Sequence, residues 1–404
     1  MLKYTNIELE LLTDIDMVHF FQKGIRGGIS QCSERKHKAN NKFLPNYNPN
    51  EPSSFISYLD ATNLYGHSMS QSLPTGEFSW LTPHEILNLD IMNVDVDSPY
   101  GYVLEVNIHY PQELHDKHSD FPFSVERLIP PYAKSKVPKL IPNLNDKRKY
   151  IVHYRNLQQA INHGLIVMNT HRVLRFKQLC WMKPYIDLNT EMRNRSNNRS
   201  EKDFYKLRNN AVYRKTMKNV DNRIDVRLIT HWENIKRTIG ASCLISRPNL
   251  KKCSIFTENF VAIQLARVKV HYDKPLYLGF SILELSKTVM YDFFYGCIKQ
   301  QFGEDASFLY TDTDSLILKV NTDNFYEFIK NNVNKFDTSN YKMGNQFRKM
   351  NSFRSELHDI YTELKNKVAL AYHDDKRFII PNTTRTLPWG HSDIEFYRND
   401  PLGV

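Results

Sequence analysis

The stretch that most constrains this chain is 308–318, where two carboxylates lie at a turn between two apolar runs. The apolar residues on both sides predict a strand, a tight turn and a second strand. Because side chains alternate faces along a strand, Asp312 and Asp314 can both point out of one side of the hairpin tip. Two carboxylates this close repel each other unless a hard cation lies between them. A polar β-turn is the alternative, since Asp and Thr are common turn residues.

The chain has 404 residues, enough for two or three domains and a substantial core. Lysine and arginine outnumber the acidic residues by 54 to 44, which gives a formal net charge of +10. This balance favours a polyanionic partner, but it does not by itself separate nucleic acid from an anionic membrane surface.

Targeting and redox signals point to an intracellular protein. The N-terminus lacks the apolar core of a signal peptide, and no apolar stretch is long enough to span a bilayer. The five cysteines are scattered and show no C-x-x-C spacing, which argues against a zinc site and against a disulfide framework. We expect a protein of the nucleus or cytoplasm that is not secreted and has no membrane partner.

A second carboxylate, Asp60, ends the apolar run 54–60, which predicts a buried strand. Residues 61–69 then predict a turn into a short helix. An acidic residue between a strand and a helix can bind a metal ion that carries a phosphate group. Alternatively, this residue caps the N-terminus of the helix. Upstream, Gly27 and Gly28 allow close approach to a ligand or form a flexible turn.

The most basic part of the chain is 193–228, with eleven cations against four acids. At helical spacing, Lys206, Asn210, Tyr213 and Met217 share one face. This face combines a cation, an amide and an aromatic ring, which suits a charged ligand with a flat ring. The usual alternative is a basic helix that is simply exposed to solvent.

Three separated stretches, 58–66, 206–213 and 310–315, resemble motifs A, B and C of family B DNA polymerases in their order and spacing. The most similar branch is the protein-primed one, found in phages, linear organellar plasmids and Maverick-type transposons. The Ile25-Arg26-Gly27-Gly28 stretch resembles that family's linker between its editing and synthesis modules.

The resemblance implies a template-directed nucleotidyl transfer of dNTPs to a primer 3′ end with two Mg²⁺ ions, for which Mn²⁺ can substitute. It implies the catalytic carboxylates Asp60, Asp312 and Asp314, and metal ligation by Asp60, Asp314 and the carbonyl of Ala61. It implies a steric gate at Tyr65 and template contacts at Gly27 and Gly28. The implied nucleotide-binding residues, besides Tyr65, are Arg193, Arg195, Lys206, Asn210 and Tyr213. The implied partners are a DNA template and primer, dNTPs and a terminal priming protein.

The sequence departs from the family pattern in four places. Only 59 residues precede Asp60, and the sole Asp-x-Glu is Asp393-Ile394-Glu395, so an editing exonuclease is not expected. Arg214 replaces the glycine that ends motif B, where a long cation either blocks the nascent base pair or reaches a phosphate; the sequence favours obstruction. No Lys-x-Tyr follows motif C, as if a segment near Asn345 were missing, and Ile25 replaces the linker tyrosine.

We therefore expect an α+β polymerase right hand with an antiparallel palm sheet, helical fingers and an incomplete thumb, a shortened copy of the family. The expected division is a linker left from the editing module at 1–30, palm with motif A at 31–80, an insertion with strand and helix at 81–185, fingers with motif B at 186–228, a second insertion at 229–275, palm with motif C at 276–340, and a thumb remnant and tail at 341–404. Further expected elements are a strand at 102–108 and helices at 148–162, 260–270, 282–298 and 323–333.

Two neighbouring functions are disfavoured by the sequence, and one alternative is kept. Reverse transcriptases place their two motif C acids side by side, whereas Thr313 separates them here. Glycosyltransferases also use Asp-x-Asp to hold a metal and a nucleotide diphosphate, but they need neither the Asp60 stretch nor the basic helix. The alternative from another class is a catalytically decayed, DNA-binding remnant of a mobile-element polymerase.

Overall fold

The computed structural model describes residues 1–133, 136–218, 220, 223–337, 353–355, 368–369 and 375–399. The strands are β1 (Ser30–Cys32), β2 (Lys36–His37), β3 (Ser54–Ala61), β4 (Leu73–Trp80), β5 (Tyr100–His109), β6 (Glu126–Leu128), β7 (Lys139–Ile141), β8 (Lys147–His153), β9 (Ile166–Leu179), β10 (Ile224–Ile229), β11 (Leu250–Thr257), β12 (Phe260–Ala266), β13 (Ala306–Asp312), β14 (Ser315–Asn321), β15 (Phe336–Asp337), β16 (Phe353–Ser355), β17 (Val368–Ala369), β18 (Arg377–Ile379) and β19 (Thr386–Pro388).

The helices are α1 (Leu2–Thr5), α2 (Ile15–Gly24), α3 (Leu64–Met69), α4 (Pro83–Asn88), α5 (His115–His118), α6 (Tyr154–Asn162), α7 (Lys183–Arg195), α8 (Arg199–Thr216), α9 (Ala241–Ile245), α10 (Leu276–Phe293), α11 (Gln300–Phe302), α12 (Phe325–Asn331) and α14 (Ile394–Asn399). Short 3₁₀ turns are η1 (Ile91–Asn93), η2 (Gln112–Leu114), η4 (Gly303–Asp305) and η5 (Val333–Lys335), and η3 (Phe294–Lys299) is a π-helix. In the described part of the chain, no helix combines the length and hydropathy needed to cross a bilayer.

A six-stranded sheet carries the acidic hairpin. Its strand order is β1-β13-β14-β3-β16-β15, and all pairs are antiparallel except β15 with β16. Asp60 on β3 is opposite Ser315 on β14, and Asp312 on β13 is opposite both Ser315 and Ser30 on β1. This register brings the carboxylate-bearing ends of β3 and β13 and the turn between β13 and β14 to one edge of the sheet.

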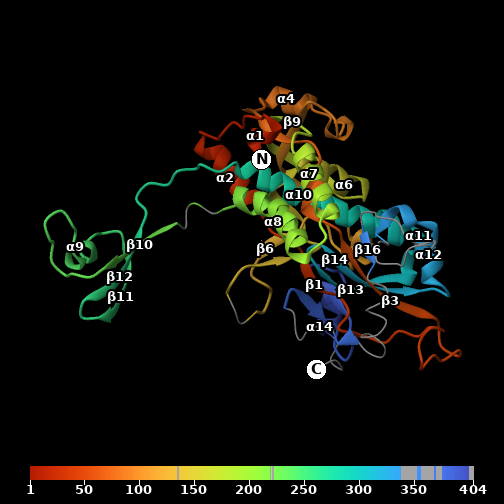
Figure 1. The fold of residues 1–404 in the computed structure, drawn as a ribbon. Helices are drawn as coiled ribbons and strands as arrows, with labels where there is room; N and C mark the ends of the chain where they lie inside the picture. Colours follow the sequence, from red (N-terminus) through yellow and green to blue (C-terminus); the bar gives the residue numbers. More distant parts are fainter. Residues whose placement is uncertain are drawn as a thin grey trace.

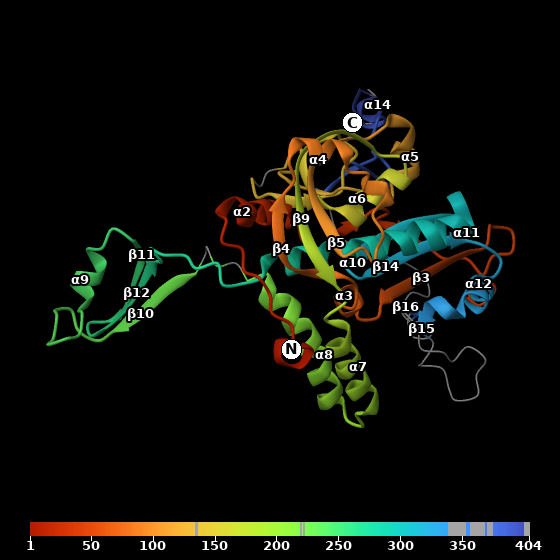
Figure 2. The same ribbon diagram turned by 90° about the horizontal axis from the view of Figure 1, so that it is seen from above.

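Helix α10 crosses the centre of the molecule and is buried on nearly every side (Figure 2). Its C-terminal residues and η3 share one apolar core with the six-stranded sheet, including Met290, Phe294, Leu59, Leu316 and Phe308. Its N-terminal half packs in a second core with the four-stranded sheet β4-β9-β5-β8. A helix that is apolar all round requires such burial, so α10 joins the two sheets.

Helices α7 and α8 form an antiparallel pair beside this body, and a small unit projects away from it (Figures 1 and 2). The projecting unit consists of the sheet β10-β12-β11 and α9. It has its own core of buried side chains, namely Ala241, Leu244, Val261, Ile263 and Leu265.

Most expected elements are confirmed, and two are wrong. The hairpin at 308–318, the strands at 54–60 and 102–108, and the helices near 61–69, 282–298 and 323–333 are present. Residues 260–270 form strand β12 and the residues after it, not a helix, because buried side chains recur at every second position and face α9. The first half of 148–162 is strand β8, since it pairs with β5, and only its second half is helical.

The expected mixed α+β class is confirmed: helices accompany sheets whose strands are almost all antiparallel. The region expected as a thumb is described only at 353–355, 368–369 and 375–399. The gap expected near Asn345 therefore lies outside the described residues.

A buried arginine helps to hold the segment 375–399 against the sheet. The guanidinium of Arg377, 1% exposed, donates to Gln31 Oε1 on β1, to the carbonyl of Ser119, and to both the hydroxyl and the carbonyl of Thr386 on β19. Removing one member of a buried charged network leaves its partners without hydrogen bonds.

We expect Arg377→Met to lower the free energy of unfolding by about 3 kcal/mol, because four hydrogen-bond acceptors lose their donor. Urea unfolding followed by circular dichroism measures this. The matched control is Arg385→Met, in which an exposed arginine just before β19 is replaced. An equal, small effect of the two substitutions would contradict the account.

Candidate active site

Asp60 and Asp312 lie at the neighbouring ends of β3 and β13, and Asp314 lies in the turn between β13 and β14, so the sheet brings these two acidic stretches together. Asp60 is partly buried at the end of β3, and the amide of the next residue, Ala61, donates to the carbonyl of Asp314 at 2.7 Å. Asp312 is exposed at the end of β13, and its carbonyl accepts the amide of Asp314 at 2.7 Å. The hydroxyl of Tyr58, on the same face as Asp60, donates to its Oδ2 at 3.4 Å.

Burial raises the pKa of Asp314, and the negative charge of Asp312 raises it further, whereas the ammonium of Lys206 on α8 lowers it. The charged form of Asp314 is therefore disfavoured where it lies. A cation at this edge would relieve that cost, and carboxylate and carbonyl oxygens are the ligands that Mg²⁺ prefers. Asp60, Asp312, Asp314 and the Ala61 carbonyl therefore offer oxygen atoms of the kind that Mg²⁺ prefers.

The predicted glycine pair lies against the acidic turn. Thr313 has a left-handed φ of 63°, and its amide donates to the carbonyl of Ile29 at 2.7 Å. A Cβ on Gly28 would come within 2.4 Å of Thr313 Oγ1, so only glycine lets the two segments approach this closely. Gly27 has a φ of +97° and open space around its Cβ position. The glycines therefore support the turn that carries Asp312 and Asp314.

One cavity of about 370 Å³ joins the three separated stretches. Its lining comes from the end of β3 and the start of α3, from α7 and α8, and from the acidic turn. The lining residues are Asp60, Ala61, Thr62, Asn63, Leu64, Tyr65, Arg193, Lys206, Asn210, Tyr213, Arg214 and Asp314. The cavity lining thus combines two carboxylates with three cations.

Two tyrosines from different stretches stack inside this lining. The rings of Tyr65 on α3 and Tyr213 on α8 are 4.2 Å apart between centroids, with an interplanar angle of 17°. Burial raises the pKa of both hydroxyls, and at Tyr65 a hydrogen bond with Tyr213 works against this. Both rings are neutral at pH 7 and form a flat wall.

Helix packing positions the basic side of the cavity. Asn198 caps α8 by accepting the amide of Glu201, and buried Asn189 of α7 donates to Asn209 of α8 at 2.9 Å. Arg193, predicted together with Arg195, lines the cavity. Arg195 is outside the lining and forms an ion pair with Glu191 one turn earlier on α7.

Sequence reasoning missed Asn63, which lines the cavity with a left-handed φ of 57°. Asn is among the few residues that adopt this conformation readily. An Asn directly before a helix that follows a strand was therefore the available signal.

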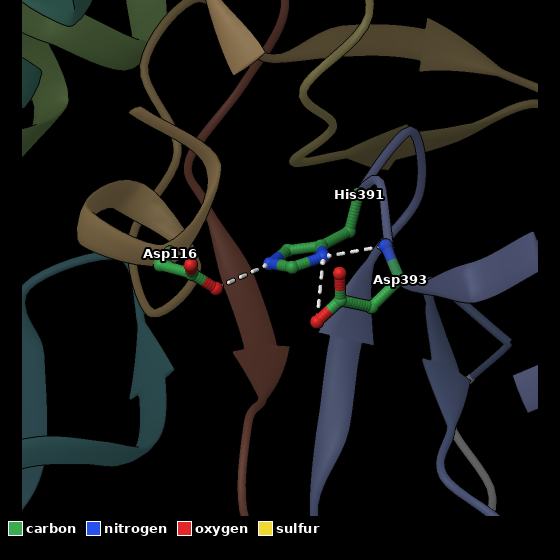
Figure 3. A group of neighbouring side chains, drawn as sticks. All are labelled: Asp116, His391 and Asp393. Atoms are coloured by element: carbon green, nitrogen blue, oxygen red, sulfur yellow. Dashed lines mark hydrogen bonds and ion pairs between the residues drawn. The ribbon is translucent and has the colours of Figure 1, made fainter. Parts of the chain in front are cut away.

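The three acidic side chains do not all bring a ligand oxygen within 4.8 Å of one another. Among the described residues, the group that meets this criterion is Asp116, His391 and Asp393 (Figure 3). There, Nε2 of buried His391 lies 3.3 Å from Asp116 Oδ1, and Nδ1 accepts the amide of Asp393. The ring nitrogens face the two carboxylates on opposite sides, and Asp116 is 94% exposed, so the group ties α5 to the tail instead of forming a closed ligand set.

Solved structures with this arrangement of elements exist. The fold resembles that of phi29 DNA polymerase. The orthorhombic crystal form of that enzyme matches with a TM-score of 0.50 and 14% identity, over 88% of this chain and 49% of its own. Its ternary complex with primer-template DNA and incoming nucleotide substrates matches with a TM-score of 0.49 and 14% identity, over 87% and 49%.

The chain thus spans about half the length of the solved structures it matches. No family model and no curated protein matches its sequence. At this identity the likeness concerns the fold.

We expect Asp314→Asn to raise the unfolding temperature at pH 7 in EDTA and to remove stabilisation by Mg²⁺. The pKa of Asp314 is raised in the folded state above its ordinary value of 3.8, so ionisation as the pH rises through that window costs stability. Mg²⁺ at ten times its dissociation constant should add about 1.4 kcal/mol to the wild type. Thermal unfolding in EDTA and in MgCl₂ measures both effects.

The control for this experiment is Asp305→Asn, an exposed residue just before β13, which should change neither quantity. Equal stabilisation of Asp314→Asn and the wild type by Mg²⁺ would mean that the ion binds elsewhere.

Proposed function

We propose that this chain is a DNA-directed DNA polymerase that adds deoxynucleotides to a primer 3′ end opposite a template. One observation carries the proposal: a single cavity is lined by Asp60, Asp314, Tyr65 and the basic face of α8, which come from three stretches far apart in the sequence. The fold's likeness to phi29 DNA polymerase supports the same reaction class.

In this proposal the six-stranded sheet is the palm, and 186–228, with α7 and α8, forms the fingers. The segments 81–185 and 229–275 are insertions, the second containing α9, β11 and β12 of the projecting unit. The linker is 1–30, and the thumb remnant lies within 341–404. These assignments follow the family resemblance, and the placement of the three motif stretches around one cavity supports them.

The basic wall would hold the triphosphate of the incoming nucleotide. Lys206 and Arg193 line the same cavity as the carboxylates, and the charge of Lys206 acts on Asp314. Cations in the same cavity as an acidic cluster would neutralise phosphate charge that otherwise repels the carboxylates. Arg195 would contribute only after leaving its ion pair with Glu191.

The carboxylates would hold two Mg²⁺ ions through Asp60, Asp314 and the Ala61 carbonyl, with Asp312 alongside. When bound, the ions would supply charge stabilisation for the transferred phosphate and a lowered pKa for the primer 3′-hydroxyl. Asp60 is near the end of β3 and Asp314 directly precedes β14, which pairs with β3, so this pairing fixes the spacing of their backbones. The raised pKa of Asp314 fits a carboxylate kept ready for a cation.

The stacked tyrosines would shape the nucleotide pocket. Tyr65 would exclude a ribose 2′-hydroxyl, and Tyr213 with Asn210 would line the forming base pair. The stacking of Tyr213 on Tyr65 supports this, because it limits how far the Tyr65 ring can turn away. Gly27 and Gly28 would let the template strand run close to the backbone beside the acidic turn.

A catalytically decayed, DNA-binding remnant is the second candidate, and Arg214 is the observation that favours it. This arginine lines the nucleotide cavity at the position where the family has glycine. A guanidinium there takes space from the nascent base pair or supplies a third cation to the phosphates.

Primer extension on a short template with Mg²⁺ and dNTPs separates the two candidates. We expect extension by the wild type, at least a hundredfold less by Asp60→Asn, and unchanged activity in the control Asp305→Asn. Absence of extension by the wild type, together with salt-sensitive binding of the same duplex, would identify the remnant and reject the enzyme.

We expect Arg214→Gly to raise the rate of incorporation about fivefold, because it frees space in a cavity of about 370 Å³. Steady-state kcat/KM for one dNTP measures this. Arg214→Lys keeps a long cation and should leave the rate near that of the wild type. A loss of activity in Arg214→Gly with retention in Arg214→Lys would assign the arginine to phosphate binding instead.

A further inference from the structure

A second cavity, of about 400 Å³, lies beside the turn that follows Asp60. Its walls come from that turn and α3, from the end of α10, from the π-helix η3, and from η5. The lining residues are Ala61, Thr62, Leu64, His67, Val289, Asp292, Phe293, Gly296, Cys297, Asn334 and Lys335.

The two cavities share a wall. Ala61, Thr62 and Leu64 line both this cavity and the nucleotide cavity. Ala61 directly follows Asp60, and its amide is bonded to the carbonyl of Asp314. A molecule in the second cavity would therefore contact the segment that directly follows Asp60.

The lining combines apolar side chains with polar ones, and one of its polar groups is buried without a partner. Leu64, Val289 and Phe293 provide apolar surface. The hydroxyl of Thr62 is buried and has no hydrogen-bond partner in the described part of the structure. Asp292, in contrast, already accepts a hydrogen bond from Gln159 at 2.6 Å. Such a lining suits a small ring-containing molecule with one hydrogen-bonding group.

A π-helix forms part of the cavity wall. Helix α10 runs into η3 (Phe294–Lys299), and short π-helical segments widen a helix locally and often occur at functional sites. A Cβ built on Gly296 meets nothing within 4 Å, so this glycine faces open space. A larger side chain at position 296 fits without a clash and would occupy part of the cavity.

We propose that this cavity binds a small, mainly apolar molecule with one hydrogen-bonding group, and that its occupancy weakens nucleotide binding through the shared Ala61–Leu64 wall. The coupling to nucleotide rests on the proposed function, whereas the binding of an apolar molecule does not. The ligand acts without touching the carboxylates, and by linkage nucleotide weakens its binding by the same factor.

Cys297 offers a covalent probe of the cavity. In a chain with Cys180, Cys243 and Cys253 replaced by Ser, N-phenylmaleimide places an apolar ring on the thiol. The sulfur adds to the maleimide double bond, one C–S bond forms as the π bond breaks, and the thiol proton ends on the neighbouring carbon. Burial raises the pKa of the Cys297 thiol, opposed by Lys335, so labelling is run at pH 8.5.

We expect one label per chain, found at Cys297 by mass spectrometry, and none when Cys297→Ser is added. Gly296→Leu should slow labelling at least tenfold by filling the cavity. Gly296→Ala, whose single methyl group leaves most of the space open, should label at close to the original rate. Labelling that is absent in the folded chain but complete in urea, or equal in Gly296→Leu and Gly296→Ala, would overturn the binding site.

The coupling is read from equilibrium binding of dATP with Mg²⁺ before and after labelling. We expect labelling to weaken dATP binding at least fivefold, and dATP to slow labelling of Cys297. Complete labelling with unchanged dATP binding would overturn the coupling. A chain that labels as expected at Cys297 but neither binds dATP nor extends a primer would instead reject the proposed polymerase function.

Discussion

The pairing of β3 with β14 is the constraint on which the candidate site depends. It places Asp60 opposite Ser315 and next to Asp314, although about 250 residues separate them in the sequence. Because side chains alternate across a strand, a slip of one residue would turn Asp60 to the other face of the sheet. Apolar alternation along both strands, with Leu59, Leu316 and Leu318 fully buried against α10, fixes this register. Burial of these apolar side chains thus offsets the repulsion between the carboxylates at the ends of the strands.

The opposite charge is supplied by a different kind of element. Helix α8 has few buried residues and presents Lys206, Asn210 and Arg214 to the cavity, while its packing against α7 and α10 fixes where they lie. Carboxylates on a rigid sheet and cations on a helix beside it suit a ligand that carries both phosphate and metal. The turn Ala61–Leu64 joins the two parts and also borders the cavity lined by Cys297, so the sheet, the basic helices and the central helix meet at one short segment.

The sequence was most informative where a local pattern and a long-range contact agree. The hairpin around Asp312 and Asp314, the strand ending at Asp60 and the basic helix carrying Lys206 could all be predicted. Residues 260–270 could not, because a short apolar run fits a buried helix as well as a strand until its sheet partners are known. Arg195 was predicted beside Arg193, but two residues apart on a helix point to different sides, and Glu191 pairs with Arg195. The cavity at Gly296 had no sequence signal, since it arises from how α10, α3 and η5 pack.

The claim that distant acidic groups form one cation site can be measured directly by replacing Mg²⁺ with Fe²⁺ in the folded wild-type chain. With ascorbate and hydrogen peroxide, bound Fe²⁺ produces radicals that cut the backbone close to the ion. The account predicts cuts near 60–62 and near 312–314 in the same molecules, both suppressed by excess Mg²⁺. Cuts confined to the neighbourhoods of Asp116 and His391, or cuts at only one of the two acidic stretches, would contradict it.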